Sequence, residues 1–231
     1  MTVGALLRPL SPRGAPVSPS TLVRNLEDAR LYFVSGASPG GRPLADVLAP
    51  ALANGVDVFQ LREKHAPDEQ IVAAAQVARA LCRDHGALFV LNDRPDLVEA
   101  AGADGVHVGQ DDTPVGEARE IVGEDRVVGL STHSEEQADA ADGVDYFAVG
   151  PVHATPTKEG RPAIGLGPVR HAAATARVPW FAIGGIDAGT LPEVLDAGAR
   201  RIVVVRAIAE ADEPGAAARR LREMLDGATQ S

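Results

Sequence analysis

Two carboxylates and three cations follow short apolar runs in this sequence, at spacings that would let them act together. Asp93 and Asp112 follow two successive runs, and Arg62, Lys64 and Lys158 follow others. Mg²⁺ in proteins is typically held by one or two carboxylates, with water and substrate phosphate oxygens as its remaining ligands. Arginine and lysine beside such an ion bind phosphate groups through charge-assisted hydrogen bonds. These residue types therefore predict a magnesium-assisted site for a diphosphate ester.

Each of these residues also has a purely structural interpretation. Asp93 lies in Asn-Asp-Arg-Pro and Asp112 precedes Thr-Pro, so either carboxylate could cap a following helix. Lysines and arginines on loops usually face water. The grouping of both signs of charge after neighbouring strands favours the metal and diphosphate interpretation.

A second candidate anion site comes from two segments late in the chain. Residues 183–186 are Ile-Gly-Gly-Ile, and Val205 and Arg206 end the next apolar run. Glycine lets a backbone approach a ligand, and the loops after the last two strands of a (β/α)₈ barrel commonly bind phosphate. A tight turn is the alternative role for Gly184 and Gly185. Two anion sites indicate transfer of a group between two phosphorylated molecules.

Other chemistries have less support in the sequence. Ser131 could donate its hydroxyl to a phosphate, but residues 129–133 depart from G-x-S-x-G at the last position, so a hydrolase nucleophile is not expected. The sequence contains neither a P-loop nor a dinucleotide-binding fingerprint, and its histidines lack H-E-x-x-H spacing. Cys82 is the single cysteine and is expected to be a buried small hydrophobe.

The elements that must position these residues form a repeating pattern. Eight short runs rich in β-branched and aromatic residues are each followed by a turn and an amphipathic stretch. We therefore predict a closed (β/α)₈ TIM barrel, with an open doubly wound sheet as the alternative. In such a barrel the working residues lie where the strands end. The expected strands are 31–34, 56–61, 87–91, 105–108, 127–130, 145–149, 180–183 and 202–205.

Composition limits the partners and the location of the protein. The 231 residues include 22 Lys and Arg against 32 Asp and Glu, giving a net charge of −10. A net negative charge disfavours binding of the protein to nucleic acid and to anionic membranes. No apolar run approaches the roughly 20 residues of a membrane span, and no signal peptide is recognisable, so a cytoplasmic location is expected. Residues 1–28, rich in proline, are expected to be a disordered tail, and 29–231 a single catalytic domain.

Six segments, in order, resemble the motifs of the thiamine phosphate synthase family. The resemblance spans about residues 31–208 and implies a (β/α)₈ barrel transferase. Such an enzyme condenses 4-amino-2-methyl-5-(diphosphooxymethyl)pyrimidine with 4-methyl-5-(2-phosphooxyethyl)thiazole to give thiamine phosphate and diphosphate. The segments are 60–64 (Gln-Leu-Arg-Glu-Lys), 92–94 (Asn-Asp-Arg), 105–112 (Gly-Val-His-Val-Gly-Gln-Asp-Asp), 129–131 (Gly-Leu-Ser), 150–158 (Gly-Pro-Val-His-Ala-Thr-Pro-Thr-Lys) and 183–186 (Ile-Gly-Gly-Ile).

The resemblance also implies a role for each matched position, with Asp93 and Asp112 as the Mg²⁺ ligands. Tyr32 and His107 match positions that line the pyrimidine pocket. The pyrimidine diphosphate is expected at Gln60, Leu61, Arg62, Glu63, Lys64, Asn92, Ser131 and Lys158. Of these, catalysis is expected from Arg62, Lys64, Ser131 and Lys158. The thiazole phosphate is expected at Thr155, Pro156, Thr157, Gly185, Val205 and Arg206.

Two positions depart from the family's usual pattern. Ser35-Gly36 follows the first strand where Thr-Asp is common, and Arg206 stands where Ser or Thr is common. A guanidinium at position 206 could replace a hydroxyl contact to phosphate with a charge-assisted one. Glycines and a proline in the loop 159–165 suggest a lid over the substrates.

Three other functions are compatible with a barrel of this kind. One is a thiazole tautomerase-like isomerase, which would not need the diphosphate cluster. Another is a barrel that binds thiamine precursors without catalysis, and the third is an unrelated phosphosugar enzyme. Under each of them the partners are small molecules, and a homo-oligomer is compatible with the sequence.

Overall fold

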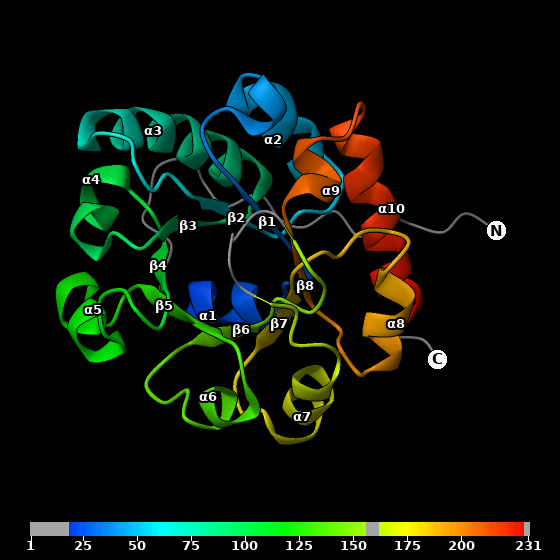
Figure 1. The fold of residues 1–231 in the computed structure, drawn as a ribbon. Helices are drawn as coiled ribbons and strands as arrows, with labels where there is room; N and C mark the ends of the chain where they lie inside the picture. The colour runs from blue at the N-terminus through cyan, green and yellow to red at the C-terminus, as the bar shows by residue number, and fades with distance from the viewer. Residues whose placement is uncertain (1–18, 156–161, 229–231) are drawn as a thin grey trace.

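The computed structural model describes residues 19–155 and 162–228, and within them the fold is a closed barrel of eight parallel strands (Figure 1). The predicted (β/α)₈ architecture is confirmed, and the open sheet is wrong because β1 pairs with β8, Leu31 opposite Ile202. The strands are β1 (Leu31–Ser35), β2 (Val58–Leu61), β3 (Leu88–Asn92), β4 (Gly105–Val108), β5 (Val127–Thr132), β6 (Tyr146–Val149), β7 (Trp180–Ile183) and β8 (Ile202–Val204).

Helices surround the barrel and alternate with the strands along the chain, as the repeating pattern of the sequence predicts (Figure 1). Prolines precede several of them, as Pro67 precedes α3, and Gly86 ends α3 in the left-handed conformation with φ +68°. Short turns at Pro39–Gly41 and Pro95–Leu97 add to them. The helices are α2 (Leu44–Ala53), α3 (Asp68–His85), α4 (Val98–Ala101), α5 (Val115–Val122), α6 (Glu135–Asp139), α7 (Gly167–Thr175), α8 (Leu191–Asp196), α9 (Arg206–Ala209) and α10 (Pro214–Gly227).

Alternation along the strands divides the apolar residues into two cores. In β1, Leu31 and Phe33 pack in a large outer core between the strands and the helices. Tyr32 and Val34 belong to a smaller inner core inside the barrel, together with residues such as Phe181. Because successive side chains point to opposite sides of a strand, every second residue faces the barrel axis. The same alternation sends polar residues near the strand ends into the barrel.

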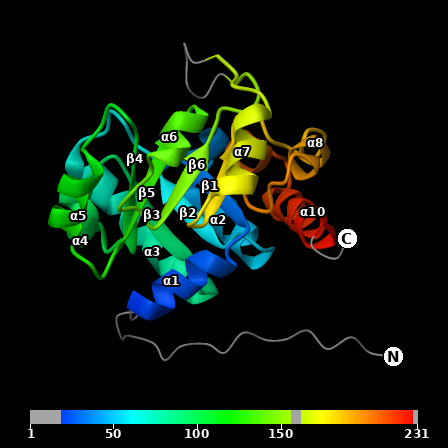
Figure 2. The same ribbon diagram turned by 90° about the horizontal axis from the view of Figure 1, so that it is seen from below.

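The inner core is closed at the end where the strands begin by helix α1 (Pro19–Asp28), which lies across that end (Figure 2). Leu22 and Leu26, spaced one helical turn apart, are buried there in the same apolar cluster as Leu88 and Val127. The predicted tail over residues 1–28 is therefore wrong for residues 19–28, because these leucines cover apolar strand ends. Residues 1–18 of the predicted tail lie outside the described residues.

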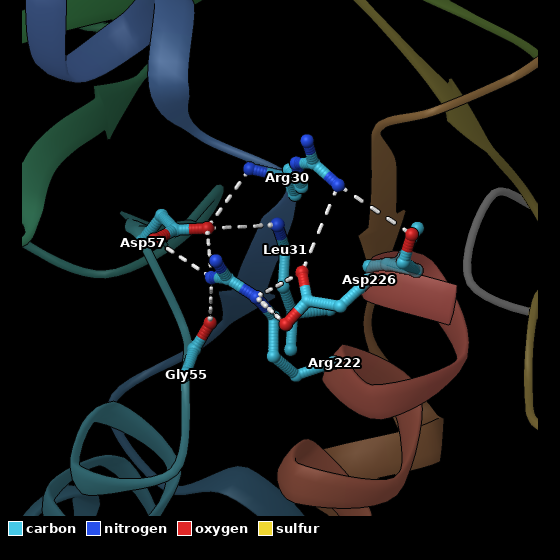
Figure 3. Close-up of polar contacts among 7 residues, drawn as sticks. Arg30, Leu31, Gly55, Asp57, Arg222 and Asp226 are labelled. Atoms are coloured by element: carbon cyan, nitrogen blue, oxygen red, sulfur yellow. Dashed lines mark hydrogen bonds and ion pairs between the residues drawn. The ribbon is translucent and has the colours of Figure 1, made fainter. Parts of the chain in front are cut away.

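Aspartates just before β2, β4 and β6 tie neighbouring strands together. Asp104 accepts a hydrogen bond from the Phe89 amide at 2.9 Å, and Asp145 accepts one from the Val128 amide at 2.7 Å. Asp57 does the same for β1 (Figure 3). Charge-assisted hydrogen bonds of this kind are about twice as strong as neutral ones. They fix where adjacent strands begin and so help to set the register of the barrel.

The Asp57 site also anchors the last helix to the first two strands (Figure 3). Asp57 accepts from the Arg30 and Leu31 amides at 2.8 and 3.1 Å, and Arg222 of α10 lies 3.0 Å from its Oδ2. The Nε of Arg222 donates in turn to Asp226, at 3.0 Å. The Asp57 carboxylate is only 12% exposed, so solvent screens this pair weakly.

Candidate active site

A cavity of about 300 Å³ lies at the end of the barrel where the strands finish. Strand alternation brings polar side chains from β2 to β5 into it, and the loops after β6, β7 and β8 complete its wall. A pocket at this end is where ligands of (β/α)₈ barrels bind. Ten of the predicted site residues line it: Tyr32, Gln60, Arg62, Asn92, His107, Ser131, Thr155, Gly185, Val205 and Arg206.

A chain of buried hydrogen bonds runs across the barrel at the base of this cavity. The Gln60 amide donates to the Tyr32 hydroxyl at 2.7 Å, and that oxygen lies 2.9 Å from the Tyr146 hydroxyl. The Tyr146 hydroxyl lies 3.1 Å from Nδ1 of His107, whose Nε2 lies 2.9 Å from Ser131 Oγ. All five residues are buried, the most exposed being Ser131 at 8%. Buried polar groups linked in this way fix one arrangement of side chains.

The direction of donation along these hydrogen bonds sets the protonation and the tautomer of His107. With Gln60 donating to Tyr32, we infer that Tyr32 donates to Tyr146 and that Tyr146 donates to Nδ1 of His107, because this direction gives each buried hydroxyl proton an acceptor. His107 is then neutral with its proton on Nε2, which donates to Ser131. Ser131 therefore keeps its own hydroxyl proton for a ligand in the cavity. Burial raises the pKa of both Tyr32 and Tyr146, so these phenols stay neutral.

Tyr146 is a part of this arrangement that the sequence did not single out. Its ring lies opposite Gly129 of β5, where a side chain of any kind would collide with the phenol. The glycine in Gly-Leu-Ser thus makes room for Tyr146. This role can be recognised only when the pairing of β5 with β6 is known. An inward-facing tyrosine in a strand was the one available signal.

The two predicted metal ligands lie next to each other. Burial raises the pKa of the Asp93 carboxyl, and the neighbouring Asp112 carboxylate raises it further, whereas Lys64, 2.9 Å from Asp93 Oδ2, lowers it. Asp112 also accepts from the Gly109 amide at 2.9 Å. Asp93 adopts φ +60°, the left-handed region that few residues other than glycine occupy.

A divalent cation fits these two carboxylates. They repel each other in a half-buried site, and a positive ion between them removes that repulsion. Among the described residues, no group of three or more His, Cys, Asp or Glu side chains forms a metal site. A pair of carboxylates is what Mg²⁺ typically takes from a protein when phosphate oxygens supply further ligands.

Several predicted residues lie elsewhere. The Leu61 side chain is fully buried in the outer core, on the face of β2 opposite Gln60. Glu63 turns away from the cavity and accepts a hydrogen bond from the Ala37 amide at 2.6 Å. Neither side chain is among those that line the cavity, and alternation along β2 places Leu61 on the face opposite Gln60. Pro156, Thr157 and Lys158, and the first half of the suggested lid, lie outside the described residues.

The second candidate anion site lies where β7 and β8 end. Gly184 and Gly185 have φ of +109° and +63°, which only glycine adopts readily, and a Cβ on Gly185 would lie 2.7 Å from that of His153. Arg206 follows β8 and lies 4.0 Å from Glu210, one turn further along α9. Glu210 lines the cavity and was not predicted, because it belongs to the region beyond the last matched motif.

A closed eight-stranded barrel with a polar cavity at its strand ends defines a (β/α)₈ barrel of the ligand-binding and catalytic class. Within that class the sequence itself is specific. A family model for thiamine monophosphate synthase matches residues 31–208. The chain belongs to the thiamine monophosphate synthase family.

Individual relatives cover nearly the whole chain. A thiamine-phosphate synthase from Mycolicibacterium vanbaalenii is 54% identical over 218 residues, which cover 89% of this chain and 98% of that protein. A thiamine-phosphate synthase from Streptomyces avermitilis is 51% identical over 212 residues, covering 90% and 98%. The solved structure of a thiamine phosphate pyrophosphorylase from Pyrococcus furiosus matches with a TM-score of 0.80 at 32% identity, covering 90% of this chain and 98% of that one.

Proposed function

We propose that this chain is a thiamine-phosphate synthase. It is a transferase of thiamine biosynthesis that joins 4-amino-2-methyl-5-(diphosphooxymethyl)pyrimidine to 4-methyl-5-(2-phosphooxyethyl)thiazole, releasing diphosphate. The observation behind this proposal is the 54% identity to a thiamine-phosphate synthase over almost the full length of both chains. The polar cavity at the strand ends is consistent with it. We take residues 29–231, together with helix α1 that closes the barrel, to form one catalytic domain.

The pyrimidine diphosphate is proposed to bind on the β2 to β5 side of the cavity. Arg62 and Asn92 line this side, Lys64 lies beside Asp93, and Ser131 has a hydroxyl proton to donate. Tyr32, Gln60 and His107 form the floor on which the pyrimidine ring would rest. Lys158, outside the described residues, is proposed to add a third positive charge. These cations compensate the charge of a diphosphate in an otherwise acidic protein.

Asp93 and Asp112 are the residues that would hold Mg²⁺. Bound there, the ion would neutralise charge on the diphosphate and favour its departure. Lys64 already pairs with Asp93 at 2.9 Å, so this lysine can exchange between the carboxylate and the phosphate oxygens. Mg²⁺ remains a prediction from the donor set and the resemblance.

The thiazole phosphate is proposed to bind at the β7 and β8 end of the cavity. Gly185 and the backbone after Val205 leave room for a phosphate, and Thr155 and Arg206 offer side-chain donors at the same wall. Thr157, outside the described residues, is proposed to join them. The two substrates would then face each other across one cavity.

The reaction is proposed to begin with departure of the diphosphate. The bond between the pyrimidine methylene carbon and the diphosphate oxygen breaks, and both electrons leave with the oxygen. The thiazole nitrogen then donates its lone pair to the methylene cation. No general base is required, because that nitrogen carries no proton. Arg62, Lys64 and Ser131 stabilise the charge that grows on the leaving group, which is electrostatic stabilisation of the transition state.

One experiment distinguishes this function from its alternatives. Purified protein is incubated with both precursors, with and without Mg²⁺, while thiamine phosphate and diphosphate are measured. The proposal requires both products and a dependence on Mg²⁺. Isomerisation of the thiazole substrate alone would indicate a tautomerase, and tight binding without diphosphate release would indicate a binding protein.

Location and assembly are separate questions. Among the described residues, no helix is both long enough and apolar enough to cross a membrane. A cytoplasmic location and a homo-oligomer stay predictions. The substrates under this proposal are small molecules.

A further inference from the structure

Glu63 stands between two residues of the proposed diphosphate site and faces the opposite way. Arg62 lines the cavity and Lys64 pairs with Asp93, whereas the Glu63 carboxylate contacts the loop after β1. Resting on the function proposed above, we propose that Glu63 is a positioning residue, and that Gly36 leaves the space in which it acts. Together they hold Arg62 and Lys64 toward the diphosphate of the pyrimidine substrate.

Two hydrogen bonds join the end of β1 to the end of β2. The Arg62 amide donates to the Ser35 carbonyl at 2.9 Å, which continues the pairing of the two strands by one residue. The Ala37 amide then donates to Glu63 Oε1 at 2.6 Å. Residues 62–67 have no regular secondary structure, so few backbone bonds restrain them. The Glu63 contact lies where the strand pairing stops and the functional side chains begin.

Gly36 determines whether this contact can form. A Cβ on Gly36 would lie 2.6 Å from Glu63 Oε1, closer than real Cβ atoms approach other atoms. Gly36 has no positive φ, so alanine fits its backbone conformation. An alanine here would therefore displace the Glu63 carboxylate from the Ala37 amide without straining the chain. The glycine that follows Ser35 at the end of β1 is thereby matched to an acid in the next loop.

The orientation of Glu63 also has an electrostatic consequence. A free carboxylate between Arg62 and Lys64 could pair with either cation and would repel a diphosphate. Like charges a few ångströms apart in a partly buried site repel each other more strongly than they do in water. Binding to the Ala37 amide directs the negative charge toward the β1 loop instead. The two cations then remain available to the substrate.

The test compares Glu63→Ala, Glu63→Gln and Gly36→Ala with the wild type. Steady-state kinetics gives KM for each substrate, and calorimetry gives the affinity for inorganic diphosphate in the presence of Mg²⁺. We expect Glu63→Ala and Gly36→Ala each to raise KM for the pyrimidine diphosphate, and to weaken diphosphate binding, by about 10- to 100-fold, the range for residues that orient ligating groups. KM for the thiazole phosphate should not change.

Two further variants separate positioning from direct contact. Glu63→Gln keeps an oxygen that can accept from the Ala37 amide, so it should restore most of the affinity. The double variant Glu63→Ala with Gly36→Ala should be no worse than either single change, because both remove one contact. Two control variants make the same kinds of substitution away from this contact. They are Glu223→Ala, at an exposed position on α10, and Gly227→Ala, where a Cβ meets open space.

Several results would overturn the proposal. These are wild-type kinetics in Gly36→Ala, additive losses in the double variant, or Glu63→Gln as damaging as Glu63→Ala. Thermal unfolding of each variant reports whether the barrel is intact. If the wild type makes no thiamine phosphate, the proposed function fails, whereas the diphosphate affinities of the variants still decide the role of Glu63.

Discussion

Replacing Tyr146 with phenylalanine removes one hydroxyl from the middle of the buried chain of hydrogen bonds. That hydroxyl lies 2.9 Å from the Tyr32 oxygen and 3.1 Å from Nδ1 of His107. The ring contacts with Phe181, 5.7 Å between centroids, should survive. Leaving a buried polar group without its partner costs about 1–3 kcal/mol, and two groups are affected here. Since Tyr32 and His107 each keep one other bond, we expect a loss of about 2–4 kcal/mol in unfolding free energy.

This loss should lower the thermal midpoint by about 4–16 °C for a protein of this size. The change should also alter His107, because it removes the hydroxyl that directs the His107 proton to Nε2. A proton on Nδ1 would make Nε2 an acceptor for Ser131, and Ser131 could no longer donate to the substrate. Losing one hydrogen bond to a charged diphosphate oxygen, worth about 1.5–3 kcal/mol, lowers turnover by about 13- to 160-fold.

Thermal unfolding, steady-state kinetics and nitrogen NMR of the His107 ring measure these three effects. Tyr32→Phe is the matched control: it removes an equivalent buried hydroxyl but leaves Tyr146 bonded to His107. It should lower stability while keeping the proton of His107 on Nε2. An unchanged His107 tautomer in Tyr146→Phe would refute the direction of donation inferred from the structure.

The remaining predictions concern ionisation, catalysis and stability. The chain has two tyrosines, Tyr32 and Tyr146, and burial raises the pKa of both, so absorbance at 295 nm should not rise near pH 10 in the folded protein but should do so in urea. Because the unfolded state then binds fewer protons, unfolding free energy should fall as the pH rises past about 10, and a native transition near pH 10 would contradict the buried network. Arg62→Ala should lower kcat/KM by about 10²- to 10³-fold with an unchanged thermal midpoint, and wild-type turnover would remove its proposed role. Asp57→Ala should lower the unfolding free energy by about 3 kcal/mol in urea titrations, because it leaves Arg222 without its main partner, and Asp57→Asn should lose less.

Much of the fold could be predicted because strand alternation and helix-start prolines are local signals. The eight strands, their parallel pairing and the end of the barrel that holds the polar residues all follow from such patterns. Helix α1 was missed because its main sequence signal is Leu22 and Leu26 at one-turn spacing, and the helix begins at Pro19 after a segment with three further prolines. Its stability comes from covering the strand starts, which is a tertiary effect.

The candidate site was predictable residue by residue only where alternation could be applied. Gln60 and Arg62 face the cavity, whereas the motif that contains them predicts that every residue of the segment binds the substrate. Leu61, between them, points into the outer core, and Glu63 binds the Ala37 amide instead of lining the cavity. Tyr146 required the cross-strand register with Gly129, which two segments 17 positions apart cannot reveal from sequence alone.

Pairing between β1 and β8 joins segments from opposite ends of the chain, Leu31 beside Ile202. During synthesis β1 leaves the ribosome early, and one of its edges stays unpaired until about 170 further residues have been added. At about 5–20 residues per second, this edge is exposed for roughly ten to thirty seconds. Such an exposed edge can pair with other nascent chains. The interval before closure is therefore when this protein is most dependent on chaperones, and truncations that remove β8 should aggregate rather than yield a smaller barrel.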